Sequence, residues 1–559
     1  MLPPRAACLA LAATVLAGAC AGAPPSRPDQ VGAAPLASAA PASAIVVTVP
    51  PITRPDGETA AWWFRDGAAQ AAARGAMSGR AKNVILFVGD GMSLTTVSAA
   101  RILDGQNRGG TGEEHRLGWE HYPATALART YNTDTQTPDS AGTMTAMATG
   151  VKTRSGVVNV GPSALHGDCA GAQQVPLLSL WELAAEAGMA TGVVSTARLT
   201  HATPAATFAR VADRGWESDA DLPAAAKRAG CIDIARQLIE TPFGHGPEVL
   251  LGGGRSNFTT AAQADPEYPA LTGRRRDGRD LVARWRQAHP DGAYVWNVAQ
   301  LADAPAHAPL LGLFEPSHMQ YEHDRPRDAA GEPSLAEMTR AAIERLQRDE
   351  DGYLLLVEAG RIDHAHHASN AYRALDDTIA MSEAVALANQ LTSADDTLIV
   401  VTADHSHTLG FAGYPQRGNP ILGLVREAPA RPGAEAELTR DADGLPYTTL
   451  SYGNGPGHVE PAPGQTGRPD LREVDTQHPD YLQEALVPLA SESHGGDDVG
   501  IWARGPGSDA VRGSVEQSAV FHFMLQATPH LRQALCARDL CDTNGVPVEL
   551  PAPAEFIAD

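Results

Sequence analysis

One short segment of the sequence concentrates side chains that bind metals. Residues 361–367 read Arg-Ile-Asp-His-Ala-His-His, and Glu358 stands just before them. Asp363 and His367 are four residues apart, so on a helix both would face the same way and could hold one ion. A histidine-rich turn can also be a solvated loop, but three histidines and two acids within ten residues favour a metal site.

Two further candidate ligand groups follow apolar runs. Asp404 and His405 come directly after Leu-Ile-Val-Val-Thr-Ala and offer a carboxylate and an imidazole, a combination that zinc accepts. Asp90 lies between two glycines, which permit a tight turn and a close approach. Each residue alone could be an ordinary turn residue, so the prediction of a metal site depends on their occurring together.

A candidate nucleophile lies in residues 138–143, Pro-Asp-Ser-Ala-Gly-Thr. The small residues that follow, 144–149, predict a helix that begins near Ser140, and the free N–H groups at a helix start favour an anion. Serine is also a common N-cap. A nucleophilic role for Ser140 therefore depends on the metal site.

The elements that must position these side chains are short buried strands that alternate with helices. Apolar, β-branched runs typical of parallel strands occur at residues 83–88, 190–195, 352–357 and 398–402. Helical patterns occur at residues 176–187, 334–347 and 372–391. The alternation predicts an α/β fold with a central, mostly parallel sheet and helices on both faces.

The ionisable residues fall just beyond those strands. His201 and Thr203 follow the second strand, as the other candidates follow theirs. Ligands bind at the carboxyl edge of open α/β sheets, so four separate segments are predicted to meet at one edge. Residues 413–490 are rich in Pro and Gly and are interpreted as a surface insertion, not a separate domain.

The N-terminus resembles an export signal. Residues 1–19 combine Arg5, an apolar run and small residues, and are predicted to be a signal peptide. Leu-Ala-Gly-Ala-Cys at 16–20 resembles a lipoprotein signal that would acylate Cys20, and it also fits ordinary cleavage; a membrane-anchored lipoprotein and a free periplasmic or secreted protein are both consistent. Residues 20–80 are interpreted as a tether and N-terminal segment. The sequence predicts no transmembrane helix.

Four cysteines lie outside the signal and its cleavage site. An even number in an exported protein predicts two disulfides, for which three pairings are possible. The five-residue spacing makes Cys536 to Cys541 the obvious local loop, and Cys169 with Cys231 then follows.

The formal net charge of −23 bears on the class of partner. A protein that binds nucleic acid through its phosphates needs clustered Lys and Arg on a basic surface. The charge therefore argues against nucleic acid binding, and a small substrate fits better.

These motifs together resemble the alkaline phosphatase family from about residue 83 to residue 506. The segments that carry the resemblance occur in the family's order and are 83–92 (NVILFVGDGM), 138–143 (PDSAGT), 201–204 (HATP), 213–219 (DRGWESD), 357–367 (VEAGRIDHAHH), 402–407 (TADHSH) and 493–499 (SHGGDDV). The resemblance implies a catalytic domain at 81–530, a tail at 531–559 with a disulfide, and hydrolysis of small phosphate monoesters through a covalent phosphoserine at Ser140.

The same resemblance implies two zinc ions and one magnesium ion. Their ligands would be Asp363, His367 and His494 for the first zinc, Asp90, Asp404, His405 and Ser140 for the second, and Asp90, Thr203 and Glu358 for magnesium. A zinc on the serine lowers its pKa, and the other zinc stabilises the leaving oxygen and then activates water for a second displacement.

Arg214 matches the arginine that clamps two phosphate oxygens, a task that suits its planar fork. His201 and His364 stand near magnesium, where the animal-type enzymes also carry histidines, so the site resembles that branch. Thr203 replaces the serine of that branch and supplies the same hydroxyl oxygen.

A calcium site rests on a thinner resemblance. In the animal-type enzymes two glutamates, a backbone carbonyl and an aspartate form a site of oxygen donors, which calcium prefers. The matching positions are Glu267, Glu315, the carbonyl of Phe314, and Glu332, a glutamate where the family has aspartate. We expect the site to survive the extra methylene; the alternative is that these acids are ordinary surface residues.

The predicted disulfide pairings also match the animal-type enzymes, and a homodimer is expected by analogy. A phosphodiesterase or sulfatase of the same superfamily is the nearest alternative, but its nucleophile is usually Thr or a modified Cys. A non-catalytic phosphate-binding protein would require a lost ligand, and the sequence lacks none.

Overall fold

The structure is a computed structural model that describes residues 45–431, 433–460 and 467–557. The predicted signal peptide, Cys20 and the rest of the predicted tether up to residue 44 lie outside these residues. Among the described residues, every helix is too short or too polar to span a bilayer.

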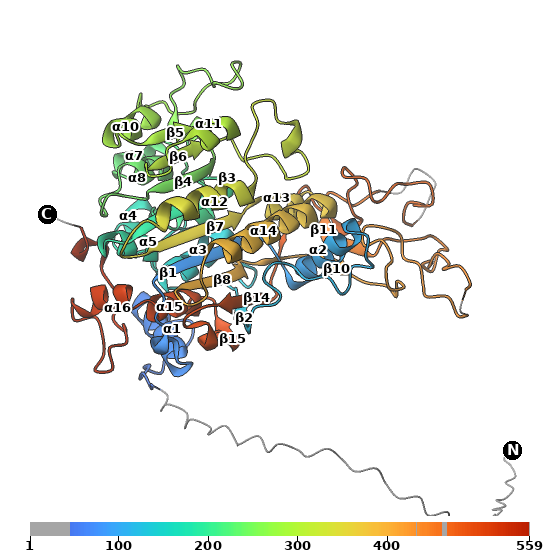
Figure 1. Cartoon of the computed structure of the whole chain (residues 1–559), viewed down its shortest axis with the longest axis horizontal. Helices are drawn as coiled ribbons and strands as arrows, with labels where there is room; N and C mark the ends of the chain where they lie inside the picture. The colour runs from blue at the N-terminus through green and yellow to red at the C-terminus, as the bar shows by residue number, and fades with distance from the viewer. Residues whose placement is uncertain (1–44, 432, 461–466, 558–559) are drawn as a thin grey trace, which may run out of the picture. The chain divides into compact units, whose positions relative to one another are not determined.

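A ten-stranded sheet forms the centre of the described chain, in the order β15-β2-β14-β8-β1-β7-β3-β4-β6-β5 (Figure 1). Its strands are β1 (Asn83–Gly89), β2 (Ala124–Arg129), β3 (Ala190–Arg198), β4 (Val249–Gly253), β5 (Ala293–Val295), β6 (Leu310–Leu313), β7 (Tyr353–Ala359), β8 (Thr397–Ala403), β14 (Val499–Arg504) and β15 (Gly513–Glu516). Strand β14 runs antiparallel to β2 and β8, and the other pairings are parallel. The predicted α/β class is confirmed.

Burial explains why the central strands were recognisable. Strands β1, β7 and β8 are buried along their whole length, and such strands carry continuous apolar runs. Strand β2 instead alternates buried and exposed residues.

The helices pack on the sheet and on one another. They are α1 (Ala60–Ala73), α2 (Leu94–Asn107), α3 (Ser140–Thr149), α4 (Cys169–Ala172), α5 (Leu180–Glu186), α6 (Ala202–Ala205), α7 (Ala224–Arg228), α8 (Ile234–Ile239), α9 (Arg255–Phe258), α10 (Leu281–Ala288), α11 (Val298–Asp303), α12 (Leu335–Leu346), α13 (Arg361–His367), α14 (Ala371–Leu391), α15 (Ala519–Ala527) and α16 (Pro529–Cys536), with the 3₁₀ turns η1 (Ala76–Ser78), η2 (Arg325–Arg327), η3 (Ser508–Ala510) and η4 (Pro553–Glu555). Helices α12 and α14 pack together on β7, and α5 and α6 contact the same strand.

Capping residues set the ends of two predicted helices. Ser334 and Glu337 form a capping box, so α12 begins one residue after the predicted start. Ser179 and Glu182 form a second box that starts α5 at Leu180, four residues later than the sequence predicts. Helix α14 begins one residue earlier than predicted, after the N-cap Asn370.

Part of the segment 20–80, which is interpreted from the sequence as a tether and N-terminal segment, is folded. Helix α1 lies within residues 20–80, buries Trp63 and Phe64, and packs against α15. The sequence did not predict this helix, because its composition is rich in alanine and only a few large apolar side chains mark its buried face.

Residues 413–490 contribute two of the three strands of a small second sheet. It consists of β10 (Leu409–Phe411), β11 (Leu450–Gly455) and β12 (Ala485–Pro488). A ribbon of β9 (Ser406–His407) and β13 (His494–Gly495) brings the chain back toward the central sheet.

Two disulfides link Cys169 to Cys231 and Cys536 to Cys541. Both predicted pairings are confirmed.

Candidate active site

Four neighbouring parallel strands deliver candidate residues to one edge of the sheet. In the order β8-β1-β7-β3, Gly89 pairs in register with both Ala359 and Ala403. Asp90 and Asp404, which follow these strands, therefore stand at the same level. This is the convergence that the sequence predicts at the carboxyl edge.

Ser140 is the first residue of α3, and its hydroxyl faces the strand ends. Its Oγ lies 3.3 Å from Asp90 Oδ1 and 3.1 Å from His405 Nε2. Asp139, not Ser140, is the N-cap, since its carboxylate accepts hydrogen bonds from the backbone of Ala141 and Gly142. The alternative that Ser140 serves as a capping residue is excluded, and the helix-start N–H groups of Ala141 and Gly142 already have an acceptor.

Asp363, His367 and His494 form a first group of potential ligands. His494 Nε2 lies 3.2 Å from His367 Nε2 and 3.4 Å from Asp363 Oδ1, and His367 Nε2 also lies 3.4 Å from Asp363 Oδ1. A tetrahedral ion with bonds of about 2.0–2.1 Å holds its ligand atoms about 3.3 Å apart. The three atoms therefore have the spacing of three ligands on one zinc ion.

Asp90, Asp404 and His405 form a second group. His405 Nε2 lies 3.4 Å from Asp90 Oδ1 and 3.2 Å from Asp404 Oδ2. Asp404 Oδ1 accepts from the backbone N–H groups of Gly91 and His405 at 2.9 and 2.8 Å. Its Oδ2 is buried without a hydrogen bond, so it is free to bind an ion.

A third group of potential ligands lies beside Asp90 and consists of Glu358, Thr203 and His201. Potential ligand atoms of Asp90, His201 and Glu358 lie within 4.8 Å of one another. Glu358 accepts a hydrogen bond from Ser195, but its Oε1, the Thr203 hydroxyl and Asp90 Oδ2 are buried without partners. Unpaired buried oxygens cost free energy unless an ion or water satisfies them, so these oxygens fit a magnesium site.

The electrostatics of the strand ends also favour bound cations. Burial, together with Asp363, Asp404 and Glu358, raises the pKa of Asp90 well above its ordinary value. Burial likewise raises the pKa of Glu358 to about 7. Several carboxylates packed this closely cannot all be ionised without positive charge among them, and bound divalent metals would supply it.

His407 and Glu492 belong to the site, although neither was selected from the sequence. His407 Nε2 donates to Asp363 Oδ1 at 2.8 Å, and its Nδ1 bonds to Glu492. Burial alone would lower the pKa of His407, but these two acids outweigh it and raise the pKa to about 9. His407 stands two residues after His405 on an extended segment, and that alternation was the available signal.

Arg214 contacts Asp139, the residue directly before Ser140. Its Nη1 is 3.2 Å from Asp139 Oδ2 and its Nη2 is 2.9 Å from His201 Nε2. The rings of His201 and His364 lie 5.5 Å apart, and His364 Nδ1 accepts from Arg361 at 3.1 Å. The structure thus brings Arg214, His201 and His364 to the same edge as the potential ligands.

Two acids of the predicted calcium site, Glu267 and Glu315, lie close together, but the third acid near them is Asp328 and not Glu332. Carboxylate oxygens of Glu267, Glu315 and Asp328 lie within 4.8 Å of one another. Burial and the neighbouring carboxylates raise the pKa of Glu267 to about 7. Phe314, which precedes Glu315 in the sequence, is buried. The carboxylate of Glu332 does not belong to the group of three acids.

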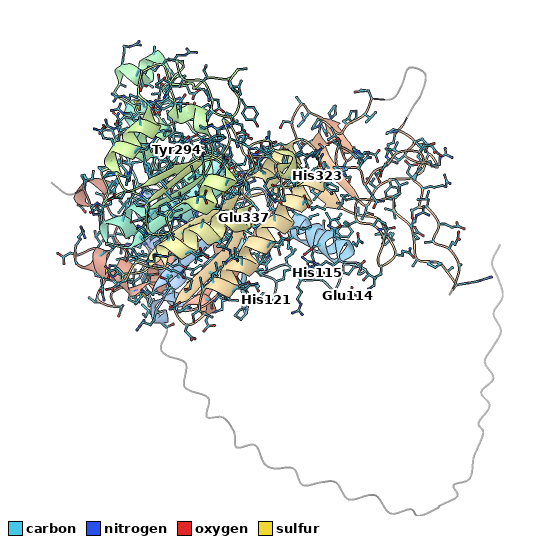
Figure 2. The ribbon with its side chains drawn as sticks, turned by 45° about the horizontal axis from the view of Figure 1, so that its top comes forward. Glu114, His115, His121, Tyr294, His323 and Glu337 are labelled. Carbon is cyan, nitrogen blue, oxygen red and sulfur yellow. A yellow bond between two sulfur atoms is a disulfide. The ribbon has the colours of Figure 1, made fainter. Side chains whose placement is uncertain are left out.

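Some histidines do not belong to the groups of potential metal ligands. His115, His121 and His323, labelled in Figure 2, lie in loops. His115 pairs with Asp104 at 2.6 Å, and His323 packs against Tyr372. Histidine content alone therefore does not identify the site.

The arrangement can transfer a phosphoryl group. A buried hydroxyl at Ser140 faces two clusters of potential metal ligands, and Arg214 offers a guanidinium to the same space. A hydroxyl beside metal-binding carboxylates and imidazoles is a suitable nucleophile for a phosphate ester.

Comparisons with known proteins agree with this geometry. A family profile described as alkaline phosphatase matches residues 81–529. The chain is 45% identical over 455 residues to the tissue-nonspecific alkaline phosphatase isozyme of Gallus gallus, covering 80% of this chain and 84% of that protein. It is 44% identical over 457 residues to an alkaline phosphatase of Gadus morhua, covering 80% and 92%.

Solved structures show the same fold. The alkaline phosphatase of Thermus thermophilus matches with a TM-score of 0.58 and 26% identity, covering 88% of this chain and 100% of that one. The alkaline phosphatase of the Antarctic bacterium TAB5 matches with a TM-score of 0.54 and 19% identity, covering 81% and 99%.

Proposed function

We propose that this chain, which belongs to the alkaline phosphatase family, hydrolyses phosphate monoesters through a covalent phosphoserine at Ser140. Family membership makes it a phosphomonoesterase, and the covalent route is the step that we add. The observation that carries the proposal is the position of Ser140 Oγ, 3.1 Å from His405 Nε2 and 3.3 Å from Asp90 Oδ1.

Two zinc ions and one magnesium ion are the proposed cofactors. Asp363, His367 and His494 would hold one zinc; Asp90, Asp404, His405 and Ser140 the other; and Asp90, Thr203 and Glu358 the magnesium. The ions would supply positive charge that favours the ionised serine and the developing negative charge on the leaving and attacking oxygens.

The protein's own residues set the order of bond changes. Ser140 Oγ loses its proton to solvent and attacks phosphorus, so an Oγ–P bond forms while the ester P–O bond breaks, and the leaving oxygen takes up a proton from solvent to become the alcohol. Water then cleaves the Oγ–P bond, which releases inorganic phosphate and restores the serine. Two in-line displacements leave the configuration at phosphorus unchanged.

His407 fixes the position of the Asp363 carboxylate through a hydrogen bond. Its ring lies between Asp363 and Glu492 and donates to both carboxylates, which fixes the orientation of Asp363 toward His367 and His494. Arg214 is proposed to bind two phosphate oxygens with its planar fork.

Replacement of Ser140 by alanine tests the covalent route. We expect turnover of a chromogenic monoester to fall by roughly 10³-fold or more, because the nucleophile is lost while the surrounding charges stay. Elemental analysis should show zinc and magnesium unchanged, and Ser163→Ala, an exposed serine, should keep wild-type turnover.

An acid quench of the wild type during turnover should yield a peptide phosphorylated at Ser140. Near wild-type turnover of Ser140→Ala would rule out the mechanism. A diester of the same chromogenic alcohol should be a much poorer substrate than the monoester, and a preference for the diester would favour a phosphodiesterase.

We further propose a calcium ion at the cluster around Glu267 and Glu315, a homodimer, and export to the periplasm or beyond, with Cys20 as a site of lipid attachment. Both disulfides are consistent with an oxidising compartment. Mass spectrometry of the mature N-terminus would decide between acylated Cys20 and ordinary cleavage, and sedimentation would decide the oligomeric state.

A further inference from the structure

We infer that Asp328, not Glu332, supplies the third carboxylate of the proposed calcium site. This inference rests on the calcium proposal and changes its ligand set. The matching sequence position is Glu332, whereas the geometry selects a residue four positions earlier in the same loop.

The first observation is the distance between the carboxylates. Oxygens of Glu267, Glu315 and Asp328 lie within 4.8 Å of one another, close enough to bind one ion. The three acids come from separate segments: Glu267 follows α9, Glu315 follows β6, and Asp328 follows η2. Three like charges from distant parts of the chain repel one another unless a cation lies among them.

The second observation is that the cluster contains buried oxygens without donors. Glu267 Oε1 and Asp328 Oδ2 are buried and accept no hydrogen bond, and the side chain of Glu267 is only 3% exposed. Leaving a buried carboxylate oxygen unsatisfied is costly, so each such oxygen requires a partner.

Other oxygens of the cluster accept hydrogen bonds from the protein. Arg255 Nη2 donates to Glu267 Oε2 at 3.1 Å. The hydroxyl of Tyr268 and the amide of Gln320 each donate to Glu315 Oε1 at 3.1 Å. These contacts orient the acids and leave their free oxygens for an ion.

The protein neutralises this charge only in part. Arg255 is the buried cation beside the cluster, but its guanidinium makes two hydrogen bonds of 2.8 Å to Asp265. Its charge is therefore shared with an acid outside the cluster. The free atoms are all carboxylate oxygens, which calcium prefers, whereas zinc sites usually include nitrogen or sulfur.

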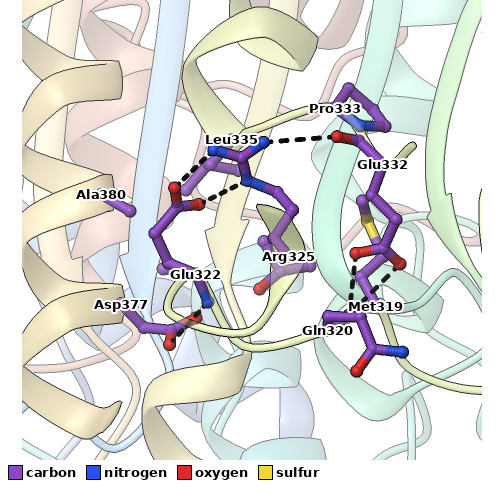
Figure 3. A pocket seen from close by; sticks show the side chains of 11 residues that line it. Met319, Gln320, Glu322, Arg325, Glu332, Pro333, Leu335, Asp377 and Ala380 are labelled. Carbon is purple, nitrogen blue, oxygen red and sulfur yellow. Dashed lines mark hydrogen bonds and ion pairs between the residues drawn. The ribbon is translucent and has the colours of Figure 1, made fainter. Parts of the chain in front are cut away.

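The hydrogen bonds of Glu332 to Gln320 and Arg325 are drawn in Figure 3. Both of its carboxylate oxygens accept from the backbone N–H of Gln320, at 3.2 and 3.0 Å. Its backbone carbonyl accepts from Arg325 at 3.4 Å. Glu332 thus ties the loop to Gln320, and Gln320 in turn donates to Glu315, so we assign Glu332 to positioning the site.

Calcium titration of two isosteric variants tests the assignment. Wild type, Asp328→Asn and Glu332→Gln are purified with zinc and magnesium and titrated with CaCl₂ by calorimetry. Terbium luminescence is a second readout, because Tyr268 lies against the cluster and can sensitise a bound terbium ion. Asp303→Asn removes an exposed acid of α11 and serves as the control.

We expect Asp328→Asn to weaken calcium binding about 10- to 100-fold and Glu332→Gln to weaken it less than about threefold. Asp303→Asn should match wild type, and Asp328→Asn should keep its zinc and its wild-type circular dichroism. Loss of terbium luminescence in Asp328→Asn alone would support the same conclusion.

Each other outcome overturns the inference in a recognisable way. If Glu332→Gln loses calcium as much as Asp328→Asn, or more, the ligand set expected from the family is correct and ours is wrong. If wild type binds neither calcium nor terbium, the calcium proposal fails together with the Asp328 assignment. Should Asp328→Asn not fold, the affinity of Glu332→Gln still decides between the two acids.

Discussion

Replacing Arg214 by alanine isolates phosphate binding from the covalent step. The guanidinium lies between Asp139 and His201, and 26% of the side chain is exposed. Its fork can donate two charge-assisted hydrogen bonds to a phosphate, worth about 1.5–3 kcal/mol each. The full loss would be about 3–6 kcal/mol, and access of water to the partly exposed position favours the lower end.

We therefore expect kcat/KM of Arg214→Ala to fall by roughly 10²–10³-fold. Most of the change should be in KM, because the proposed metal ions would still bear much of the transition-state charge. The inhibition constant of inorganic phosphate should rise by a similar factor. Kinetics with a chromogenic monoester, at saturating zinc and magnesium, give all three quantities.

Two variants serve as comparisons for Arg214→Ala. Arg214→Lys keeps the charge but loses the planar fork, so its loss should be intermediate. Arg348→Ala changes an exposed arginine after α12 and should have no effect. A loss for Arg214→Ala that equals or exceeds that of Ser140→Ala, or an unchanged affinity for phosphate, would refute the reasoning.

Three further predictions concern stability, each measured by urea or thermal unfolding. Lys152 is buried, donates to the carbonyls of Arg129 and Tyr131, and pairs with Glu516 at 2.9 Å. Lys152→Met should cost about 3–5 kcal/mol, and adding Glu516→Gln should restore more than half; no recovery would contradict the pairing. His522 is buried, neither ring nitrogen has a hydrogen-bond partner among the residues that the structure describes, and burial lowers its pKa to about 3. Because the folded pKa is below the unfolded value of about 6.5, the free energy of unfolding should decrease by up to about 5 kcal/mol as pH falls from 6.5 toward 3. His522→Leu should flatten that part of the curve, and an unchanged acid limb would contradict the assignment. The disulfides span 62 and 5 residues, so removing Cys169–Cys231 should cost about 4 kcal/mol and removing Cys536–Cys541 about 2 kcal/mol; the reverse order would show that chain entropy does not control them.

The individual elements of the site could be predicted from the sequence. Strands β1, β7 and β8 carry continuous apolar runs because both of their faces are buried, and polar residues mark their ends. The spacing of Asp363 and His367 placed both on one face of a helix, and α13 has them there. These signals are local, so they depend on backbone periodicity alone.

The roles of some residues depended on neighbours that are distant in sequence. Ser140 meets Asp90 across 50 residues, and His494 meets His367 across 127. The packing of helices and strands decides such contacts, and no local pattern in the sequence encodes that packing. The family resemblance supplied what local reasoning could not.

The hydrogen-bond partners that the fold brings together decided the roles of the remaining site residues. The sequence could not show that Asp139 caps α3 and contacts Arg214, or that His407 lies between two acids. Likewise, Glu332 and Asp328 are both acids of one loop, and only the folded chain places the N–H of Gln320 beside the first and the free oxygens of Glu267 and Glu315 near the second. A side chain binds the partner that tertiary packing brings within reach, so residue type determines what it can bind and the fold determines what it does bind.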